Sequence, residues 1–393
     1  MRLSRADQSL FARWWFSVDH LQLLAVLCLL AVGMVVSLAA SPSVADAKGL
    51  PTYYFAKRHA VFAVIGLLVI IGLSLQTASE TRRLALVVFA LSLAGLIIVS
   101  FVGVEANGAR RWLRVAGISI QPSEVAKPAF VILAGWAFAE TRRRYDMPAF
   151  PISLGLYAVF AILLLMQPDV GQFILVTAAW GVMLFLSGIS ILWLAGLAAA
   201  GGIALVVAFF AMPHVQNRLV QFLSSDIDAS SQIGQAYRSF TQGGLFGAGP
   251  GEGTIKTSLP DAHTDFIFAV IAEEYGVVVC LMLLGLYAFI VLRAFVRAIG
   301  EPDIAIRFAI MGLAVLFGGQ ALINMGVNVG LLPAKGMTLP LISAGGSSMV
   351  GISITLGMML ALTRQRASLG TYADHPNEAA MNFEPTAANE ASR

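Results

Sequence analysis

The chain has 393 residues, of which 58% are hydrophobic and only 12% are charged, and its mean hydropathy is +0.81. A soluble domain carries about a quarter charged residues. These values therefore exclude a soluble enzyme and predict a polytopic membrane protein. Long apolar runs can satisfy their backbone groups in lipid only as helices, so the predicted fold class is all-α. The net charge of +3 is small and indicates little about partners. We expect the membrane lipid, and no nucleic acid, among them.

Taken in order, the chain contains ten apolar segments long enough to be transmembrane helices. They lie at about residues 21–40, 59–76, 84–102, 125–141, 151–166, 173–186, 191–212, 266–292, 308–327 and 349–362. Residues 1–20 form an N-terminal segment, and residues 21–366 form one membrane domain with a large outer loop at about 213–264. Residues 367–393 are polar and aperiodic, which predicts a disordered tail.

The distribution of Lys and Arg places both termini in the cytoplasm, because short basic turns favour the inner side of a membrane. The inner turns are otherwise short and plain, whereas every unusual polar motif falls on the outer face. A transporter needs polar groups through the midplane of the membrane. An enzyme that acts on a lipid head group needs them at one interface, which is the pattern found here.

The longest outer motif runs from Gly243 to Gly276 and reads GGLFGAGPGEGTIKTSLPDAHTDFIFAVIAEEYG. It places Asp265, with His263 beside it, at the mouth of an apolar helix, where a carboxylate is costly unless it is hydrated, paired or used. We predict that Asp265 carries the chemistry. The alternative is that it only caps the helix, whose dipole would stabilise its anion. Glu273 and Glu274 fall inside the apolar run, and we assign them no role.

A second outer motif, NGARRWLRVAGISIQPSEVAKP, combines arginines with an acid and a base. Guanidinium groups suit phosphate oxygens, so we interpret Arg110 and Arg111 as contacts for an anion. Arg114 is as well explained by anchoring at the lipid head groups. Glu124 and Lys127 are three residues apart on one helix face. They form either a structural ion pair or a support for catalysis.

Three further features lie on the outer face. In QPDVGQ, Asp169 either caps the next helix or supplies a second carboxylate that, with Asp265, could hold a divalent cation. Asn324 and Asn328 share one helix face and suit hydrogen bonds between helices. Lys335, in the Gly- and Pro-broken stretch GLLPAKGMTLPLISAGGSS, is another candidate phosphate contact.

Together these motifs resemble the SEDS family (shape, elongation, division and sporulation), ten-helix peptidoglycan glycosyltransferases. The matching pieces are GARRW, QPSEVAKP, QPDVGQ, GGLFGAGPGEG, LPDAHTDFIFAVIAEEYG and NMGVNVGLLPAKGMTLPLISAGGSS, and they cover almost the whole membrane region. The form VNVGLLPAKGMTLP is more like the cell-division branch than the elongation branch. Asp261 stands where the family usually has Glu, and Ala344 stands where many members have an aromatic residue.

The resemblance implies that Asp265 matches the family's essential outer-face aspartate. It implies polymerisation of lipid II through β-1,4 bonds with release of undecaprenyl pyrophosphate. It also implies a class B penicillin-binding transpeptidase and divisome regulators as partners, in a bacterial inner membrane with the site on the periplasmic face at the septum. A divalent cation, Mg or Mn, is the candidate cofactor. The alternatives are a lipid II flippase and a non-catalytic divisome scaffold.

Overall fold

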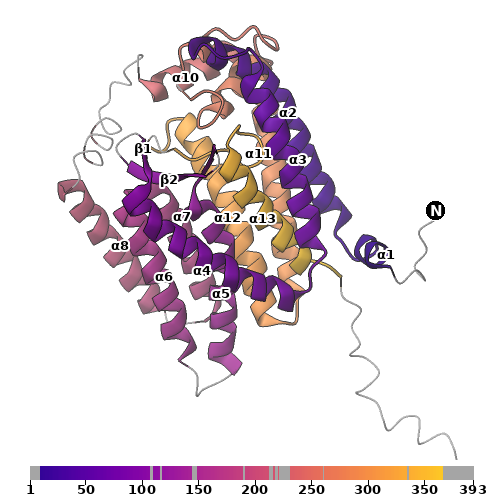
Figure 1. The fold of residues 1–393 in the computed structure, drawn as a ribbon, viewed down its shortest axis with the longest axis vertical. Coiled ribbons are helices and arrows are strands. Elements are labelled where there is room, and N and C mark those ends of the chain that lie inside the picture. Colours follow the sequence, from indigo (N-terminus) through magenta and orange to yellow (C-terminus); the bar gives the residue numbers. More distant parts are fainter. Residues whose placement is uncertain are drawn as a thin grey trace, which may run out of the picture.

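The computed structural model describes residues 9–106, 109–115, 117–143, 148–188, 191–211, 216, 220, 231–259, 261–333 and 336–365. Within these ranges ten long helices correspond one to one with the ten predicted segments, which confirms the fold class (Figure 1). They are α2 His20–Ala47, α3 Tyr54–Ser74, α4 Ala78–Val102, α5 Pro122–Arg143, α6 Ala149–Met166, α7 Val170–Leu186, α8 Ile191–Ala211, α11 Ile267–Ile299, α12 Ile304–Asn328 and α13 Gly346–Leu362. The predicted tail, residues 367–393, lies outside the described residues.

Six of these helices are individually long and apolar enough to cross a membrane: α2, α3, α4, α6, α11 and α12. The helices α7 and α13 are apolar but shorter. Three smaller helical elements are also found within the described ranges. They are α1 Leu10–Trp15, α10 Gln232–Gly243 and the 3-10 turn η1 Ile255–Thr257, of which α10 and η1 belong to the predicted large outer loop.

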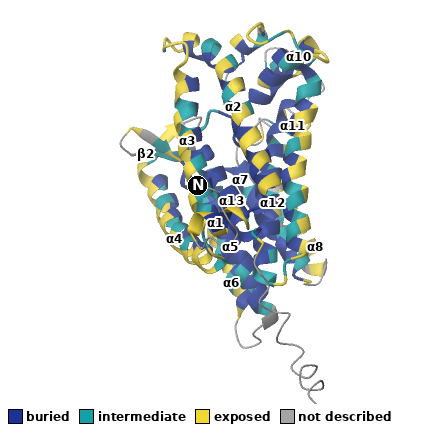
Figure 2. Ribbon diagram, turned by 90° about the vertical axis from the view of Figure 1, so that its right-hand side faces the viewer, coloured by how far each residue is buried: buried dark blue, intermediate teal, exposed yellow. Residues whose placement is uncertain are grey.

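The centre of the bundle is formed by α5, α12 and α13, and the other helices surround it (Figure 2). In α12, 72% of the most apolar window is buried, against 28% in α3, α4, α6 and α11. The central helix α5 nevertheless carries Glu124, Lys127 and Glu140, all buried. Polar side chains in a membrane protein face the interior of the bundle because the lipid outside cannot pair with them. The fold therefore gathers its polar groups around α5 and α12.

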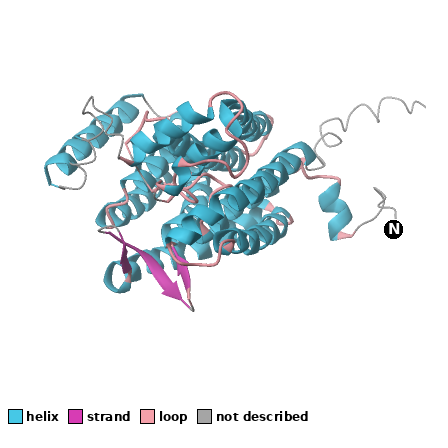
Figure 3. Ribbon diagram, turned by 90° about the horizontal axis from the view of Figure 1, so that it is seen from above, coloured by secondary structure: helices cyan, strands magenta, loops and turns pink. Residues whose placement is uncertain are grey.

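Two local predictions were wrong. The first apolar segment was predicted to end at residue 40, but α2 continues through Pro42 to Ala47. Proline is tolerated inside a membrane helix where neighbouring groups satisfy the freed backbone carbonyl. The loop between α4 and α5 contains a three-stranded antiparallel sheet of β1 Val104–Ala106, β2 Ala109–Val115 and β3 Ile118–Ile120 (Figure 3). Strands of three to seven residues give too short a pattern to be recognised beside long apolar helices.

The register of this sheet places the arginine motif on a strand. Glu105 pairs with Arg110 across β1 and β2, and Arg114 pairs with Ser119 across β2 and β3. Successive side chains of a strand point to opposite faces. Arg110 and Arg114 therefore share one face of β2, and Arg111 lies on the other.

Helix α11 is broken close to its beginning. Gly276 has φ 82° and ψ 173°, which is not helical, so Ile267–Tyr275 is a separate short helix before the long span. A continuous helix of 33 residues would be about 50 Å long at 1.5 Å per residue, whereas the hydrocarbon core of a bilayer is about 30 Å thick. The break lets the nine residues that follow Asp265 and Phe266 take their own direction at the end of the bundle.

Candidate active site

Asp265 lies in a tight turn that precedes α11, and the backbone of Asp261 organises this turn. The Asp261 carbonyl oxygen accepts the amides of Thr264, Asp265 and Phe266 at 3.0, 3.1 and 3.3 Å. Asp261 itself has φ 56°. Aspartate tolerates this left-handed conformation better than most residues. The position where the sequence departs from the family's usual Glu is therefore a position of restricted backbone geometry.

Two asparagines of α12 hold this turn through side-chain hydrogen bonds. The amide nitrogens of Asn324 and Asn328 donate to the Asp265 carbonyl oxygen at 2.8 and 3.0 Å. The Asn328 side-chain oxygen accepts the amide of Ala269, in the first turn of α11, at 3.1 Å. The predicted role of both asparagines in bonds between helices is confirmed. They fix the backbone of Asp265 and leave its side chain to point elsewhere.

The Gly- and Pro-broken stretch before α13 also contacts the turn that carries Asp265. The Ser343 hydroxyl donates to the Thr264 carbonyl at 2.6 Å, and the Ala344 amide donates to the His263 carbonyl at 2.9 Å. A methyl group placed on Gly336 would lie 3.3 Å from Oδ2 of Asp265. Irregular backbone is tolerated at membrane depth when it lines a protein cavity, and here it borders the carboxylate.

The Asp265 carboxylate is half-buried, and no donor within the described ranges bonds to it. Burial, and then the negative charge of Asp261, raise the pKa of Asp265 to about 7. The residue at the N-cap of α11 is Phe266, whose side chain makes no cap bond, and the side chain that accepts a first-turn amide of this helix is that of Asn328. The capping interpretation of Asp265 therefore finds no support. A carboxyl group with a pKa near the working pH is well suited to accept a proton.

His263 is close to Asp265 along the chain, but its ring has another environment. The imidazole is buried and packs against the ring of Phe55, with 4.2 Å between ring centroids. Burial, followed by the positive charges of Lys48 and Arg58, lowers the pKa of His263 to about 4. The ring is therefore neutral at physiological pH, and it packs against an aromatic wall of the site.

The three arginines of β2 take different positions. Arg111 donates through Nε to the Gln167 carbonyl at 2.9 Å and through Nη2 to the Pro168 carbonyl, and its Nη1 lies 3.7 Å from Asp169 Oδ1. It holds the corner between α6 and α7. Arg110 is exposed and lies 3.5 Å from the carboxylate of Glu105. An exposed pair of this kind exchanges readily with water, so Arg110 stays available to an anion, and Arg114 is exposed on the same face.

Asp169 caps α7, as one of its two interpretations predicts. Its side chain accepts the Gln172 amide at 3.4 Å and the Gln121 side-chain amide at 3.1 Å. Burial raises the pKa of Asp169, although the charge of Arg111 acts in the opposite direction. Among the described residues no group of three or more His, Cys, Asp or Glu side chains forms a metal site. A cation held by Asp169 and Asp265 therefore stays a prediction.

Glu124 and Lys127 form a buried ion pair at 2.9 Å inside a network of glutamines. The Lys127 ammonium also donates to the side-chain oxygens of Gln172 at 2.7 Å and Gln320 at 2.9 Å, and Gln172 donates to Glu124 at 2.5 Å. An ammonium has three donors. Two of them are hydrogen-bonded to the glutamines, and the contact with Glu124 is an ion pair in which Oε2 of Glu124 has no hydrogen bond among the described residues. In this conformation the pair connects α5, α7 and α12, which favours its structural interpretation.

Gln172 and Gln320 were missed by the sequence analysis. Gln320, Asn324 and Asn328 occur at intervals of four on α12, so they form one polar stripe. Gln320 donates to the Thr338 carbonyl at 3.1 Å, and Asn324 donates to the Met337 carbonyl at 2.6 Å. The four-residue spacing of the three amides was the available signal. Through this stripe the ion-pair network and the Asp265 turn contact the same loop, although Lys335 in that loop lies outside the described residues.

Glu273 and Glu274, which had no assigned role, hold the outer loop. Glu273 accepts the amides of Ile255 and Lys256 at 2.7 and 3.0 Å, and Glu274 forms an ion pair with the Lys256 ammonium. Both carboxylates and Lys256 are buried. A buried charge persists only when it is paired or hydrogen-bonded. These residues therefore fix η1 against the short first helix of α11.

The glycine-rich stretch 243–253 hydrogen-bonds the backbone groups of α11 that lose their helical partners at the break. The amides of Ala248 and Gly249 donate to the carbonyls of Glu273 and Glu274 at 2.9 and 3.1 Å. The amide of Val277 in turn donates to the Gly244 carbonyl at 3.0 Å. A Cβ atom at Gly243 or Gly247 would collide with the backbone of α11. The glycines are thus required for close contact between two backbones.

Fold and site together define an integral membrane protein with a titratable carboxylate at one end of its helix bundle. The chain belongs to the family described as "Cell cycle protein", the FtsW, RodA and SpoVE family, whose model matches residues 19–368. It is 42% identical over 367 residues to a probable peptidoglycan glycosyltransferase FtsW of Caulobacter vibrioides, covering 92% of this chain and 93% of that protein. The corresponding protein of Halomonas elongata is 37% identical over 377 residues, covering 91% of this chain and 93% of that protein.

Solved structures agree with this assignment. A chain from a study of how a peptidoglycan synthase complex coordinates polymerization and crosslinking superposes with a TM-score of 0.73 at 29% identity, covering 89% of this chain and 98% of that chain. The rod shape determining protein RodA of Thermus thermophilus superposes with a TM-score of 0.65 at 28% identity, covering 89% of this chain and 97% of that chain. The family predicted from the sequence motifs is confirmed.

Proposed function

We propose that this chain is a peptidoglycan glycosyltransferase that polymerises lipid II into glycan strands during septal cell-wall synthesis. The single observation that carries the proposal is the Asp265 carboxylate, whose backbone is fixed by Asn324 and Asn328 while the side chain stays half-buried with a pKa of about 7. Relatives similar over nine-tenths of the chain are named as probable peptidoglycan glycosyltransferases FtsW.

In this mechanism Asp265 is the general base. It takes the proton of the acceptor sugar's 4-hydroxyl as that oxygen attacks the anomeric carbon of the donor. The bond from the anomeric carbon to the pyrophosphate oxygen breaks on the opposite side, and its electron pair leaves with undecaprenyl pyrophosphate. An α-linked donor thereby gives a β-1,4 product by a single inversion, without a covalent enzyme intermediate.

The leaving pyrophosphate needs its charge neutralised rather than a proton. Arg110 is suited to this by its exposure and its weak pairing with Glu105, and Lys335 is the second candidate. A divalent cation, Mg or Mn, with Asp265 as a ligand would supply the same stabilisation of charge. Because Lys127 is engaged with Glu124, Gln172 and Gln320 inside the bundle, we assign it to positioning.

The proposal includes orientation and partners. Both termini would lie in the cytoplasm, with Asp265 on the periplasmic face of the inner membrane at the division septum. A class B penicillin-binding transpeptidase would be the partner, since a matching chain comes from a complex that couples polymerization to crosslinking. Divisome regulators would act on this pair, and lipid II would be taken from the surrounding membrane.

The buried acids favour a polymerase over a lipid II flippase. A flippase could use Glu273 and Glu274 as polar groups within the membrane, but both are already bonded to η1 and Lys256. The scaffold alternative needs Asp265 to be only a cap, but the side chain that accepts a first-turn amide of α11 is that of Asn328.

Reconstitution in liposomes with lipid II tests the proposal by scoring polymer and head-group translocation in the same sample. We expect the wild-type chain with its transpeptidase to produce glycan strands, and Asp265→Ala to produce none. Translocation without polymer would replace the polymerase by a flippase. Polymer formation by Asp265→Ala would remove Asp265 from the reaction.

A further inference from the structure

The end of the bundle opposite Asp265 contains a cavity that the proposed reaction does not use. Its volume is about 1060 Å³, and it lies among α1, the turn between α3 and α4, and the ends of α5, α12 and α13. Ile306 lines it at the start of α12, whereas Asn324 near the end of that helix contacts Asp265. Eighteen residues of helix separate the two positions, about 27 Å at 1.5 Å per residue. The cavity and Asp265 therefore face opposite sides of the membrane.

The charged side chains that line the cavity are mostly basic. Arg13, Arg82 and Arg364 contribute guanidinium groups, and the acid among the lining residues is Asp303. The Asp303 carboxylate accepts the amides of Ala305 and Ile306 at 2.8 and 3.4 Å and caps α12. The described lining thus carries three positive charges and one negative charge, a balance that favours an anion.

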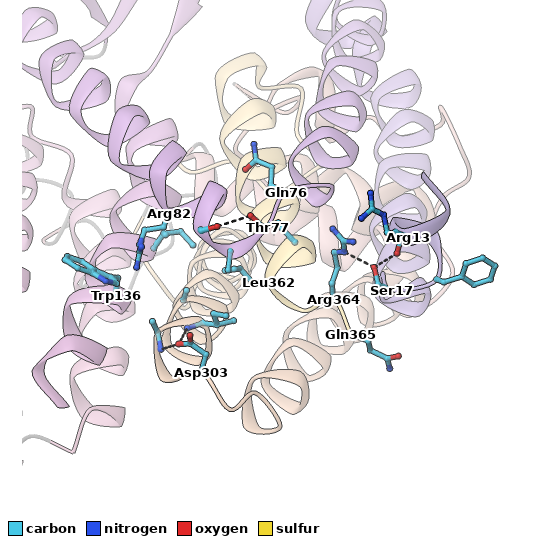
Figure 4. Close-up of a pocket in the computed structure, with 18 of the residues that line it drawn as sticks. Arg13, Ser17, Gln76, Thr77, Arg82, Trp136, Asp303, Leu362, Arg364 and Gln365 are labelled. Atoms are coloured by element: carbon cyan, nitrogen blue, oxygen red, sulfur yellow. Dashed lines mark hydrogen bonds between the residues drawn. The ribbon is translucent and has the colours of Figure 1, made fainter. Parts of the chain in front are cut away.

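The arginines enclose polar side chains that can complete such a site. Figure 4 shows Gln76 and Thr77 between Arg82 on one side and Arg364 and Arg13 on the other. The Gln76 side-chain oxygen is buried and has no hydrogen-bond partner among the described residues. A buried acceptor of this kind points to a missing donor, such as a hydroxyl group. The site thus offers guanidinium groups for a phosphate and an acceptor for a hydroxyl.

The surroundings place this cavity at the level of lipid head groups. On α1 and just after it, Leu10, Phe11, Trp15 and Phe16 are exposed by 39–74%. Exposed aromatic and aliphatic residues of a short helix at a bundle end are typical of the membrane interface. The Arg82 guanidinium stacks on the Trp136 ring at 5.6 Å. An amphiphile could therefore place its head group in the cavity while its chains stay in the bilayer.

We infer that this cavity binds an anionic phosphodiester head group that carries hydroxyl groups, such as that of phosphatidylglycerol, from the cytoplasmic leaflet. The guanidinium groups of Arg13 and Arg82 would bind the phosphate, since charge-assisted forked hydrogen bonds favour phosphate oxygens. Arg364 already donates to the Ser17 hydroxyl and the Leu75 carbonyl, and it contributes its charge. The Gln76 oxygen would accept a hydroxyl of the head group. The side of the membrane follows from the proposed orientation, but binding itself does not depend on the polymerase proposal.

Lipid retention in nanodiscs tests this site. The wild type, an Arg13→Gln/Arg82→Gln double variant and an Arg83→Gln control are each placed in phosphatidylcholine with and without phosphatidylglycerol. Arg83 is exposed beside Arg82 but does not line the cavity. Bound phosphatidylglycerol is measured by native mass spectrometry, and the Tm is measured in parallel. We expect each lost arginine to weaken binding by about tenfold, the effect of losing one charge-assisted hydrogen bond.

The controls decide between the outcomes. Equal retention by the double variant and the wild type, or an equal loss in Arg83→Gln, would overturn the site. An equal Tm in pure phosphatidylcholine establishes that the double variant is folded; if it is not, Arg82→Gln alone replaces it. A third arm adds inorganic phosphate to nanodiscs of pure phosphatidylcholine. Inorganic phosphate would be the ligand if it raises the Tm as much as phosphatidylglycerol does and if this rise requires the arginines. In that case the phosphate site stands, but its ligand is a soluble anion and the lipid is not.

Discussion

Two acidic clusters at the same end of the bundle differ in how fully their polar groups are paired. Glu124 is buried against Lys127 and bonded by Gln172, so it sits in a network that joins α5, α7 and α12. Asp265 is half-buried, its backbone is held by two asparagines, and no donor in the described part of the chain bonds its carboxylate. The paired cluster connects helices, and the open carboxylate keeps its capacity for a proton. Stability and chemistry are thereby assigned to different acids.

The largest effect on activity is expected from Asp265→Asn, which tests whether the open carboxylate accepts the proton. The amide keeps the shape of the side chain but cannot accept the proton, so we expect polymerisation to fall by roughly 10²–10⁴-fold, the usual contribution of a general base. The Tm at pH 8 should stay unchanged or rise, because an ionised carboxylate no longer has to be desolvated. Polymerisation rates and unfolding curves from one preparation check both halves. A large drop in Tm would show that Asp265 is a structural residue.

From Lys127→Met we expect instead a loss of stability. Removing one partner of a buried ion pair leaves an uncompensated charge, Glu124, which costs about 3–5 kcal/mol of unfolding free energy. The double variant Glu124→Gln/Lys127→Met removes both charges and should recover most of this loss. Denaturation in detergent micelles gives the three values. An unchanged unfolding free energy for Lys127→Met would mean that the network does not hold the helices together.

A smaller effect, confined to pH dependence, is expected from Asp261→Asn. Asn also tolerates the left-handed backbone at this position, so the turn should persist. Asp265 must be ionised to act as a base, so polymerisation of the wild type should fall as the pH is lowered through about 7. Removing the negative charge of Asp261 lowers the pKa of Asp265, and the acid limb of the rate profile should move to lower pH. An unmoved acid limb would show that Asp261 does not act on Asp265.

Linkage gives an independent check on the same group. The pKa of Asp265 is raised in the folded state above its ordinary value of 3.8. The folded chain therefore holds this proton more tightly than the unfolded chain does. The contribution of this proton to the free energy of unfolding is complete below about pH 4 and is lost as the pH rises through about 7. Unfolding free energies measured across this pH range check it.

Hydropathy and local motifs predicted the ten helices, the place of Asp265 and the bonding role of Asn324 and Asn328. They could not predict which helix supplies a partner, because Lys127 meets Gln320 across 193 positions of the chain. Glu273 and Glu274 looked like charges inside a membrane span until the break at Gly276 placed them against η1. The short sheet was not predicted for a related reason, since its strands have only three to seven residues and carry almost no periodic signal.

The break at Gly276 has a mechanical consequence. A continuous helix bends and tilts as a rod, but a residue outside the helical region interrupts that stiffness. The long leg of α11, from Val277 to Ile299, can therefore change its tilt with the thickness of the bilayer without turning the nine-residue helix that follows Asp265 and Phe266. That short helix moves instead with the glycine-rich stretch 243–253 and with α12, to which it is hydrogen-bonded. The fold thus isolates the position of one carboxylate from deformation of the surrounding membrane.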